Sequence, residues 1–250
     1  MPAAVGPQHK ALLDAAARLY LGADEFDRRF ARNKLRFDPV FFALLQGGLL
    51  PDRGTLLDLG CGRGPLLALL VAARDQFSRG QWPPGWPPPP MNLNLQGIEI
   101  NPDHAGVAQR ALIDQARVTR LDISDAAFPP CSAVVLLDVL IFLEEREQRR
   151  VLERAAAALE PGGLLLVRDA DAGAGLAFLV TRWSVRLPEI LRGRLRNRLH
   201  YRSAKQWAGL LESLGFSVAV EPMSAGTPFA NMLFVARKSP APRLNPRICG

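Results

Sequence analysis

Residues 55–66 read TLLDLGCGRGPL and predict a strand, a tight turn and a helix in direct succession. An apolar run interrupted only by Asp58 ends in three glycines at alternate positions, Gly60, Gly62 and Gly64, and an Ala/Leu-rich stretch follows at once. Glycine adopts the positive φ angles that such a turn needs, and the turn leaves backbone N–H groups and a helix N-terminus facing whatever lies above the strand. The segment is therefore predicted to cradle a ligand within an α/β sheet. Its G-x-G-x-G spacing differs from the G-x-G-x-x-G fingerprint of dinucleotide-binding proteins.

A second strand is predicted over 95–100 (LQGIEI), with Glu99 and Ile100 at its tip. Asn101 and Pro102 follow, and these residue types favour the cap and the first position of a helix. An acid at the tip of this strand in a doubly wound sheet can accept hydrogen bonds from both ribose hydroxyls of a nucleotide.

Glu99 follows Gly64 by 35 residues, whereas a βαβ unit of this kind usually places its acid about 20 residues on. Residues 79–94 (RGQWPPGWPPPPMNLN) account for the excess, because they hold six prolines and two glycines. Such a composition excludes a helix or a central strand and predicts a lengthened surface loop, with a proline-recognition ligand as the less ordinary alternative.

Three more strands are predicted in order. Residues 116–121 precede Asp122 and Ile123, residues 132–137 end at Leu137 with Asp138 at the strand mouth, and residues 159–163 (LEPGG) lead from a helix into LLLVRD. Two interpretations are open for each acid. Asp122 is predicted either to lie beside a ligand or to cap the following turn, and Asp138 either to act on a substrate or to bind loop amides.

The C-terminal third completes the sheet. Residues 203–216 form an amphipathic helix with Ser203 as N-cap, and strands follow over 216–220 and 231–238. We therefore predict an α/β, Rossmann-like fold with a seven-stranded, mostly parallel sheet whose last strand is antiparallel.

The predicted organisation is one domain over 51–238, with an insertion at 170–202, preceded by helices over 1–50 and followed by a flexible tail at 239–250. A chain of 250 residues with 48% hydrophobic content can bury one such core. No signal peptide or apolar run of membrane-spanning length is found in the sequence, so a soluble, cytoplasmic protein is expected. The three cysteines have no metal or disulfide spacing.

Ligands in open α/β sheets bind outside the carboxyl ends of the strands, where three loops are predicted: 138–144, 169–202 and 221–230. Apolar and aromatic residues dominate these loops and acids are few, which favours a small aromatic substrate. His200 is the first candidate for a catalytic base and Asp138 is the second. Each has a structural alternative, His200 as a helix C-cap and Asp138 as a ligand of loop amides.

The order of these motifs resembles that of class I S-adenosylmethionine-dependent methyltransferases. The resemblance implies that the glycine loop packs against the methionine half of S-adenosylmethionine, that Asp58 helps to hold its amino group, that Glu99 binds the ribose and that Asp122 lies beside the adenine. It also implies that the N-terminal helices cover the cofactor, and that Arg32, Lys34 or Arg36 meets the methionine carboxylate unless these residues form a solvated helix face. The complete predicted cofactor set is Asp58, Gly60, Cys61, Gly62, Gly64, Glu99, Ile100, Asp122, Ile123 and Leu137.

Four further segments resemble the methyltransferases of bacterial aryl-polyene (xanthomonadin-type) pigment pathways: FARNKLRFDPVF, WPPGWPPPP, YRSAKQWAGLLESLGF and GTPFANMLFVARK. This resemblance implies methylation of a hydroxyaryl head group, free or attached to an acyl carrier protein.

The chain carries a net charge of +7 with a pI near 10, and seven arginines fall within 182–202. Such a basic segment has three interpretations. It speeds the docking of an acidic carrier protein, it attracts RNA, or it forms a solvated face without a partner. An RNA methyltransferase is therefore one alternative. Against it, the sequence LLDVL (136–140), at the end of the strand predicted over 132–137, lacks the Asn/Asp-Pro-Pro-aromatic sequence of enzymes that methylate base amines. A catalytically inactive partner subunit is the other alternative, and the intact glycines and acids argue against it.

Overall fold

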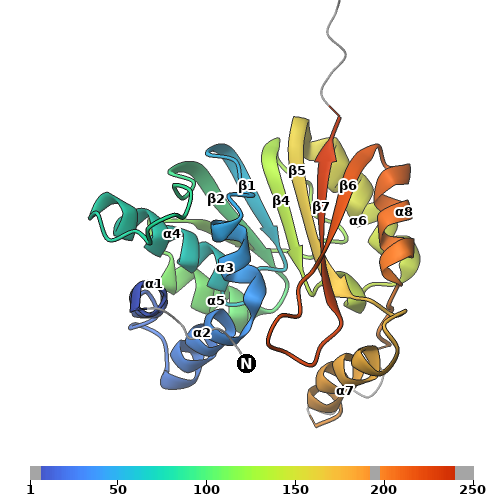
Figure 1. Ribbon diagram of the computed structural model, residues 1–250, viewed down its shortest axis with the longest axis horizontal. Helices are drawn as coiled ribbons and strands as arrows, with labels where there is room; N and C mark the ends of the chain where they lie inside the picture. Colours follow the sequence, from blue (N-terminus) through green and yellow to red (C-terminus); the bar gives the residue numbers. More distant parts are fainter. Residues whose placement is uncertain (1–6, 192–197, 240–250) are drawn as a thin grey trace, which may run out of the picture.

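The structure is a computed structural model that describes residues 7–191 and 198–239. Its helices flank a seven-stranded sheet of order β3-β2-β1-β4-β5-β7-β6 (Figure 1). In the described part of the chain, no helix combines the length and apolar character needed to cross a bilayer. Residues 240–250 of the predicted tail, and Arg192, Arg194 and Arg196 of the basic segment, lie outside the described residues.

The five strands predicted along residues 55–169 are all present and parallel. They are β1 (Arg53–Leu59), β2 (Asn92–Glu99), β3 (Arg117–Arg120), β4 (Cys131–Leu137) and β5 (Leu159–Ala170). β4 is apolar along almost its whole length and buried, as expected for a central parallel strand that has helices on both faces. All five strands end at the same edge of the sheet, so their terminal residues lie close together.

Three helices connect the parallel strands: α4 (Pro65–Ser78), α5 (Pro102–Ala111) and α6 (Glu145–Ala158). The predicted start of α5 is confirmed, because the Asn101 side chain accepts hydrogen bonds from the backbone N–H groups of the first helical turn. This cap satisfies donors that the helix itself leaves unpaired. It also fixes the chain direction directly after Glu99.

The C-terminal part follows the prediction as well. Ser203 caps α8 (Ala204–Ser213) in a capping box with Gln206. β6 (Phe216–Pro222) and β7 (Asn231–Lys238) follow, and β7 pairs antiparallel with both β5 and β6. The last strand therefore enters the sheet between its neighbours in the opposite direction.

The N-terminal region forms three helices, α1 (Pro7–Arg18), α2 (Glu25–Phe37) and α3 (Pro39–Gln46). Residues 24–48 (DEFDRRFARNKLRFDPVFFALLQGG), whose periodicity predicts a helix, are thus divided into two helices. Asp38 adopts an extended conformation and its side chain caps α3, while Pro39 lacks the N–H needed to continue α2. The division turns the chain so that the end of α2 faces the carboxyl ends of the strands.

The proline-rich loop is shorter than predicted, because Asn92–Asn94 pair with β1 and belong to β2. Trp82 and Trp86 stack edge to face with 5.6 Å between ring centroids, and His9 of α1 lies 4.7 Å from Trp86. Edge-to-face pairs of this kind are favourable. The loop is therefore packed against the N-terminal helices.

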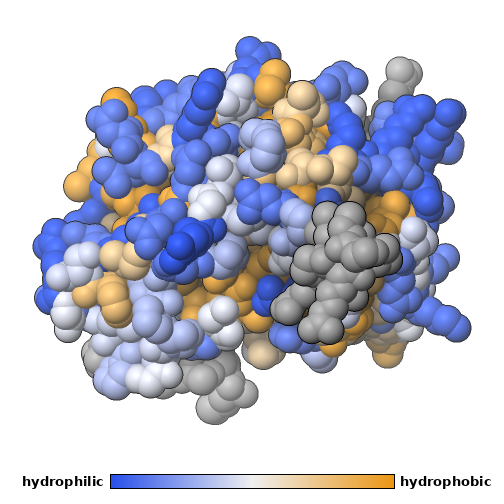
Figure 2. All heavy atoms as spheres, turned by 90° about the horizontal axis from the view of Figure 1, so that it is seen from above, coloured by the Kyte–Doolittle hydropathy of each residue, from blue (hydrophilic) through white to orange (hydrophobic). Residues whose placement is uncertain are grey.

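α7 (Gly175–Leu191) and α2 stand on either side of the edge at which the parallel strands end (Figure 1). A short 3-10 helix, η1 (Leu140–Phe142), follows β4 at the same edge. Figure 2 shows the opposite end of the molecule, where hydrophilic side chains lie around the rim and apolar ones show between them. The predicted ligand loops thus gather at one end of the sheet, between α2 and α7.

Candidate active site

The three glycines after β1 all have positive φ angles, 72° at Gly60, 57° at Gly62 and 77° at Gly64. A Cβ at Gly60 would lie 2.5 Å from the Val139 side chain, and one at Gly64 would lie 2.9 Å from Leu112. A Cβ at Gly62 would meet nothing within 4 Å. Packing within the protein therefore accounts for Gly60 and Gly64, whereas Gly62 faces open space in which a ligand would lie against the backbone.

A hollow of about 110 Å³ opens above this turn. It is lined by five of the residues predicted to hold the cofactor and by residues of α2, α3 and the start of α4. The lining residues are Phe30, Lys34, Phe41, Asp58, Gly60, Cys61, Gly62, Arg63, Pro65, Leu66 and Leu137. The structure thus brings the ends of β1 and β4 together with the N-terminal helices.

Glu99 lies next to this hollow. Its Oε2 accepts a hydrogen bond of 2.9 Å from the Gly62 N–H, and its Oε1 accepts one of 2.8 Å from the Asn101 N–H. Ile100, the next residue after Glu99, is exposed. Gly64, the last glycine of the turn, is the N-cap residue of α4. The glycine turn and the tip of β2 are therefore joined through one carboxylate.

Asp122 and Ile123 follow β3, the neighbour of β2. The Leu121 N–H donates to the Glu99 carbonyl, which places the ends of the two strands side by side. Asp122 Oδ1 accepts 2.8 Å from the Ser124 N–H, so this carboxylate caps the turn after β3. Ile123 is buried beneath the turn. The capping role does not use Oδ2, and a role beside the adenine remains a prediction.

Asp58 is almost fully buried at the base of the hollow. Burial, together with the negative charge of Glu99, raises the pKa of Asp58 to about 7. A cation bound nearby would favour the charged carboxylate. The residue therefore fits the amino group of S-adenosylmethionine, as the resemblance implies.

Arg63 and Tyr20 were not predicted, although Arg63 lies within the glycine motif. Arg63 forms an ion pair with the buried Asp27 of α2, and its guanidinium lies 4.6 Å from the centre of the Phe30 ring. The Tyr20 hydroxyl donates 2.8 Å to the Arg63 carbonyl. These contacts hold α2 over the glycine turn.

The three basic residues considered for the methionine carboxylate lie in different places. Arg32 pairs with Asp14 of α1 at 2.9 Å, and Arg36 lies over the Phe37 ring. Lys34 lines the hollow above the glycine turn. Of the three, Lys34 is the one placed to meet a cofactor.

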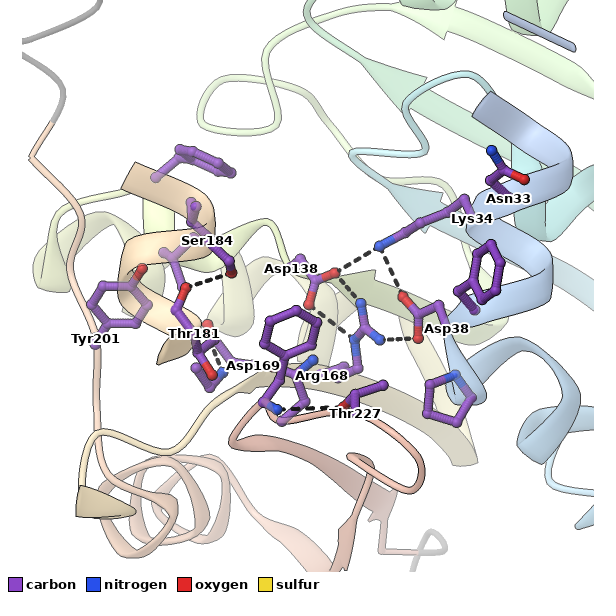
Figure 3. A pocket seen from close by; sticks show the side chains of 18 residues that line it. Asn33, Lys34, Asp38, Asp138, Arg168, Asp169, Thr181, Ser184, Tyr201 and Thr227 are labelled. Atoms are coloured by element: carbon purple, nitrogen blue, oxygen red, sulfur yellow. Dashed lines mark hydrogen bonds and ion pairs between the residues drawn. The ribbon is translucent and has the colours of Figure 1, made fainter. Parts of the chain in front are cut away.

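A larger cavity of about 320 Å³ adjoins the hollow (Figure 3). All three predicted loops contribute to it, together with α2, α3 and the end of β5. The lining residues are Asn33, Lys34, Phe37, Asp38, Pro39, Asp138, Ile141, Phe142, Arg168, Asp169, Ala170, Thr181, Ser184, Val185, Tyr201, Thr227, Phe229 and Asn231. Lys34 lines both spaces, so the cavity and the hollow lie close to each other on either side of this residue.

An ionic cluster forms one wall of this cavity (Figure 3). Arg168 is 1% exposed and binds both Asp38 and Asp138, with Nε 2.9 Å from Asp138 Oδ1. Lys34 Nζ lies 2.8 Å from Asp38 Oδ2 and 3.3 Å from Asp138 Oδ2. Burial alone would lower the pKa of Arg168, but the two carboxylates outweigh it and raise that pKa. The cluster joins α2, β4 and β5 at the strand ends.

Asp138 occupies the mouth of β4 as predicted, and its φ angle is 61°. A residue other than glycine in this region carries a strain of about 1–3 kcal/mol, and such residues concentrate at functional sites. The Asp138 N–H donates 3.0 Å to the Arg168 carbonyl, which helps to hold the conformation. The strained backbone directs the carboxylate toward Arg168 and the cavity.

His200 lies elsewhere. Its backbone N–H donates to the Ile141 carbonyl and its carbonyl accepts from Gln148, while its side chain lines a neighbouring hollow on the α7 side. Tyr201 lines both that hollow and the cavity. The structure therefore brings Asp138, but not His200, into the lining of the main cavity, and the choice of base remains a prediction.

Arg168, Asp38 and Asp169 were missed as site residues. A signal for two of them was present, because LLLVRD is an apolar strand that ends in charged residues at its carboxyl end, as β1, β2 and β4 do. Asp38 carried no comparable signal, since its position precedes the sheet in the sequence. Only the folding of α2 against the strand ends brings it to Arg168.

The hollow fits S-adenosylmethionine on three counts: open space above Gly62, a buried acid at Asp58 and a second acid at the tip of β2. Together with the sheet order and the single antiparallel strand, they define a class I S-adenosylmethionine-dependent methyltransferase. A family model described as a methyltransferase domain matches residues 25–220. The chain belongs to this methyltransferase domain family, and S-adenosylmethionine is its cofactor.

Known proteins are similar to this chain in sequence or in fold. The chain is 31% identical over 132 residues to a carboxy-S-adenosyl-L-methionine synthase of Chromohalobacter salexigens, a match that covers 49% of this chain and 44% of that protein. The matched region thus spans less than half of that relative. A magnesium protoporphyrin IX methyltransferase from Synechocystis PCC 6803, solved with bound SAH, superposes with a TM-score of 0.56 at 21% identity over 90% of this chain and 94% of that one.

An O-methyltransferase from neocarzinostatin biosynthesis is also similar in structure. It was solved with S-adenosylmethionine and 2-hydroxy-5-methyl naphthoic acid, and it superposes with a TM-score of 0.57 at 23% identity, covering 90% of this chain and 60% of that one. At such identities the two structural matches establish a shared fold.

The Glu99→Ala variant should bind S-adenosylmethionine about tenfold or more weakly, since losing a charged hydrogen-bonding partner typically costs ~1.5–3 kcal/mol. Isothermal titration calorimetry measures this affinity. Asp103→Ala, which removes an exposed acid from the first turn of α5, serves as the control and should leave the affinity unchanged. A Glu99→Ala protein with lowered thermal stability but unchanged affinity would show that this acid only ties β2 to the glycine turn.

Proposed function

We propose that this protein methylates a small hydroxyaryl acceptor bound in the cavity, as a step of aryl-polyene-type biosynthesis. The observation that carries the proposal is that Lys34 lines both the hollow above the glycine turn and a cavity with aromatic and apolar walls. The four segments that resemble aryl-polyene methyltransferases support the pathway. The naphthoic acid bound by the neocarzinostatin O-methyltransferase supports an aromatic acceptor.

S-adenosylmethionine supplies a methyl group on a positive sulfonium, which an electron-rich atom displaces in line. The protein contributes alignment and the exclusion of water. Ile141, Phe142 and Phe229 provide apolar surface for an aromatic ring, and Ile141 is fully buried. We propose that residues 1–50 act as a lid over this arrangement, with α2 held in place through the Arg63–Asp27 ion pair.

A phenol has a pKa near 10, so its conversion into a better nucleophile at neutral pH calls for a base. We assign this role to Asp138, whose carboxylate lines the cavity beside Lys34. His200 is the second candidate, and it would reach the acceptor through the neighbouring hollow that Tyr201 shares with the cavity. In either case the proton moves from the acceptor hydroxyl to the protein side chain as the methyl group is transferred.

The proposed carrier-protein partner would approach from the α7 side. A hollow of about 630 Å³ there is lined by Arg182, Arg186 and Arg198 together with Phe178 and Trp183. Carrier proteins are acidic, so a basic rim would raise the rate of encounter. An acceptor tethered to a carrier would enter the cavity past Tyr201.

The double variant Arg182→Ala/Arg198→Ala should raise the Michaelis constant for a carrier-bound hydroxyaryl substrate about tenfold at low salt, because steering by long-range charge changes association rates by ~10–10³. The Michaelis constant for a free, uncharged hydroxyaryl substrate should change by less than about twofold, because a small uncharged acceptor gains nothing from electrostatic steering. Steady-state kinetics at low and high salt measure both constants.

Arg110→Ala/Arg117→Ala removes the same charge from exposed positions at the other edge of the sheet and provides the matched control. Equal losses on the tethered and the free substrate in the α7-side variant would exclude carrier docking on this face.

One experiment tests the proposed function directly. The protein is incubated with isotope-labelled S-adenosylmethionine and hydroxyaryl acids and esters, free and carrier-bound, alongside total RNA, and the label is followed by mass spectrometry. Label in the hydroxyaryl compounds supports the proposal. Label in RNA would favour an RNA methyltransferase instead, and cofactor binding without transfer to any of these acceptors would favour a noncatalytic partner subunit.

A further inference from the structure

Asp169 is a buried acid of the cavity that the proposed reaction does not use. It lies near the end of β5, is 1% exposed and lines the cavity (Figure 3). Its Oδ1 accepts a hydrogen bond of 2.7 Å from the Ala170 N–H, whereas its Oδ2 has no hydrogen-bond partner among the described residues. Buried polar atoms are nearly always paired in folded proteins, so such an orphan calls for a partner from outside the chain.

The Tyr201 hydroxyl is a second orphan in the same cavity. It is buried without a hydrogen-bond partner in the described part of the chain, and the Tyr201 ring packs edge to face against Phe178 of α7 with 5.0 Å between centroids. That contact fixes the ring. The two residues that carry these unpaired atoms, one from β5 and one from the segment before α8, therefore line one cavity.

The charge state of the cavity restricts what these atoms can bind. Burial raises the pKa of Asp169 well above its usual value and raises that of Tyr201 to about 12, so burial favours the uncharged form of both side chains. Each can then donate one hydrogen bond.

The charges elsewhere in the lining cancel. Among the described residues that line the cavity, the cations are Lys34 and Arg168, and both are paired with Asp38 and Asp138. A ligand carboxylate beside Asp169 would therefore be buried without a free cation, which is costly. A carbonyl oxygen would accept both hydrogen bonds at no such cost.

We propose that Asp169 and Tyr201 form a polar subsite for an uncharged carbonyl oxygen of the acceptor, so that the cavity selects hydroxyaryl esters, thioesters or amides over free hydroxyaryl acids. This inference rests on the proposed function and names its substrate class. It requires that the acceptor acid be activated by ester, thioester or amide formation before methylation, so a ligase-type reaction supplies the substrate.

The first test compares meta-hydroxybenzoic acid with its methyl ester at pH 7.5, using the wild-type protein. We expect kcat/KM for the ester to exceed that for the acid by about tenfold or more, since a site that leaves a charge or a polar group unpaired discriminates at least this strongly. Calorimetry in the presence of S-adenosylhomocysteine should likewise show that the ester binds more tightly than the acid. The binding measurement decides the inference even where turnover is slow.

Three variants test the residues. Asp169→Leu should lower kcat/KM for the ester by ~10-fold or more and reduce the preference over the acid, whereas Asp169→Asn, whose amide N–H can still donate, should retain the preference. Tyr201→Phe removes only the hydroxyl and should weaken the preference several-fold. Affinity for S-adenosylmethionine should be unchanged in all three variants. If these residues were merely structural, their loss would change cofactor affinity together with selectivity.

The outcomes separate the two proposals. Equal or tighter binding of the acid, or an unchanged ester preference in both Asp169→Leu and Tyr201→Phe, would overturn the subsite while leaving a hydroxyaryl methyltransferase intact. Wild-type protein that neither binds nor methylates either compound would overturn both the subsite and the proposed function.

Discussion

Replacing Gly62 by Val should abolish S-adenosylmethionine binding and leave a folded protein. Gly62 has a φ of 57°, and a Cβ built there points into open space rather than into the protein. The valine branches would occupy the space above the glycine turn that the cofactor needs, and they would also strain the backbone by ~1–3 kcal/mol. We expect the dissociation constant to rise by at least ~100-fold, which corresponds to about 2.7 kcal/mol.

Calorimetry measures this affinity, and circular dichroism with thermal melting reports on folding. Gly85→Val is the matched control, because Gly85 in the proline-rich loop also has a positive φ, 80°, and open space around its Cβ position. It should lose similar stability and bind the cofactor normally. An unchanged affinity in Gly62→Val would mean that the cofactor does not lie against this turn.

Replacing Asp138 by Asn should lower kcat on hydroxyaryl acceptors by ~10²–10⁴, the loss typical of a missing general base. The amide preserves the shape of the side chain but cannot take a proton from the acceptor hydroxyl. The dissociation constant for S-adenosylmethionine should change little, because Asp138 lines the acceptor cavity and not the hollow above the glycine turn. Single-turnover kinetics with saturating cofactor measure the effect.

Asp38→Asn provides the comparison, since Asp38 binds the same two cations as Asp138. It should leave α3 capped, because Asn caps a helix as well as Asp does, and it should lower kcat by less than tenfold on the same scale. Similar losses of kcat in both variants would assign the effect to the ionic cluster as a whole. Full activity in Asp138→Asn with a large loss in His200→Ala would transfer the role to His200.

The fold was predictable because its signals are local. The apolar runs of β1, β2 and β4, the glycines after β1 and the caps at Asn101 and Ser203 each act within a few residues of the chain. Parallel strands that alternate with helices leave few arrangements of the sheet. The exceptions were also local, since Pro39 divides the second N-terminal helix and β2 begins three residues inside the predicted loop.

The predicted cofactor residues lie together because each stands at or just after the carboxyl end of a parallel strand, and parallel strands end at one edge of the sheet. Asp58 and Glu99 lie at the ends of β1 and β2, and Asp122 lies just after β3. Arg63 was the exception: its partner Asp27 belongs to α2, and nothing in either segment indicates the other.

By itself the sequence determined the order of the elements, the glycine turn and the acids at the strand ends, because these depend on backbone preferences and on hydrophobic periodicity along the chain. The tertiary structure alone decided the acceptor cavity. Arg168 meets Asp38 across 130 positions of the chain, and the Asp169 and Tyr201 orphans become neighbours only when β5 and the segment before α8 pack beside α7. Such contacts arise from how the elements pack, and packing depends on the shapes of many side chains at once rather than on any local pattern.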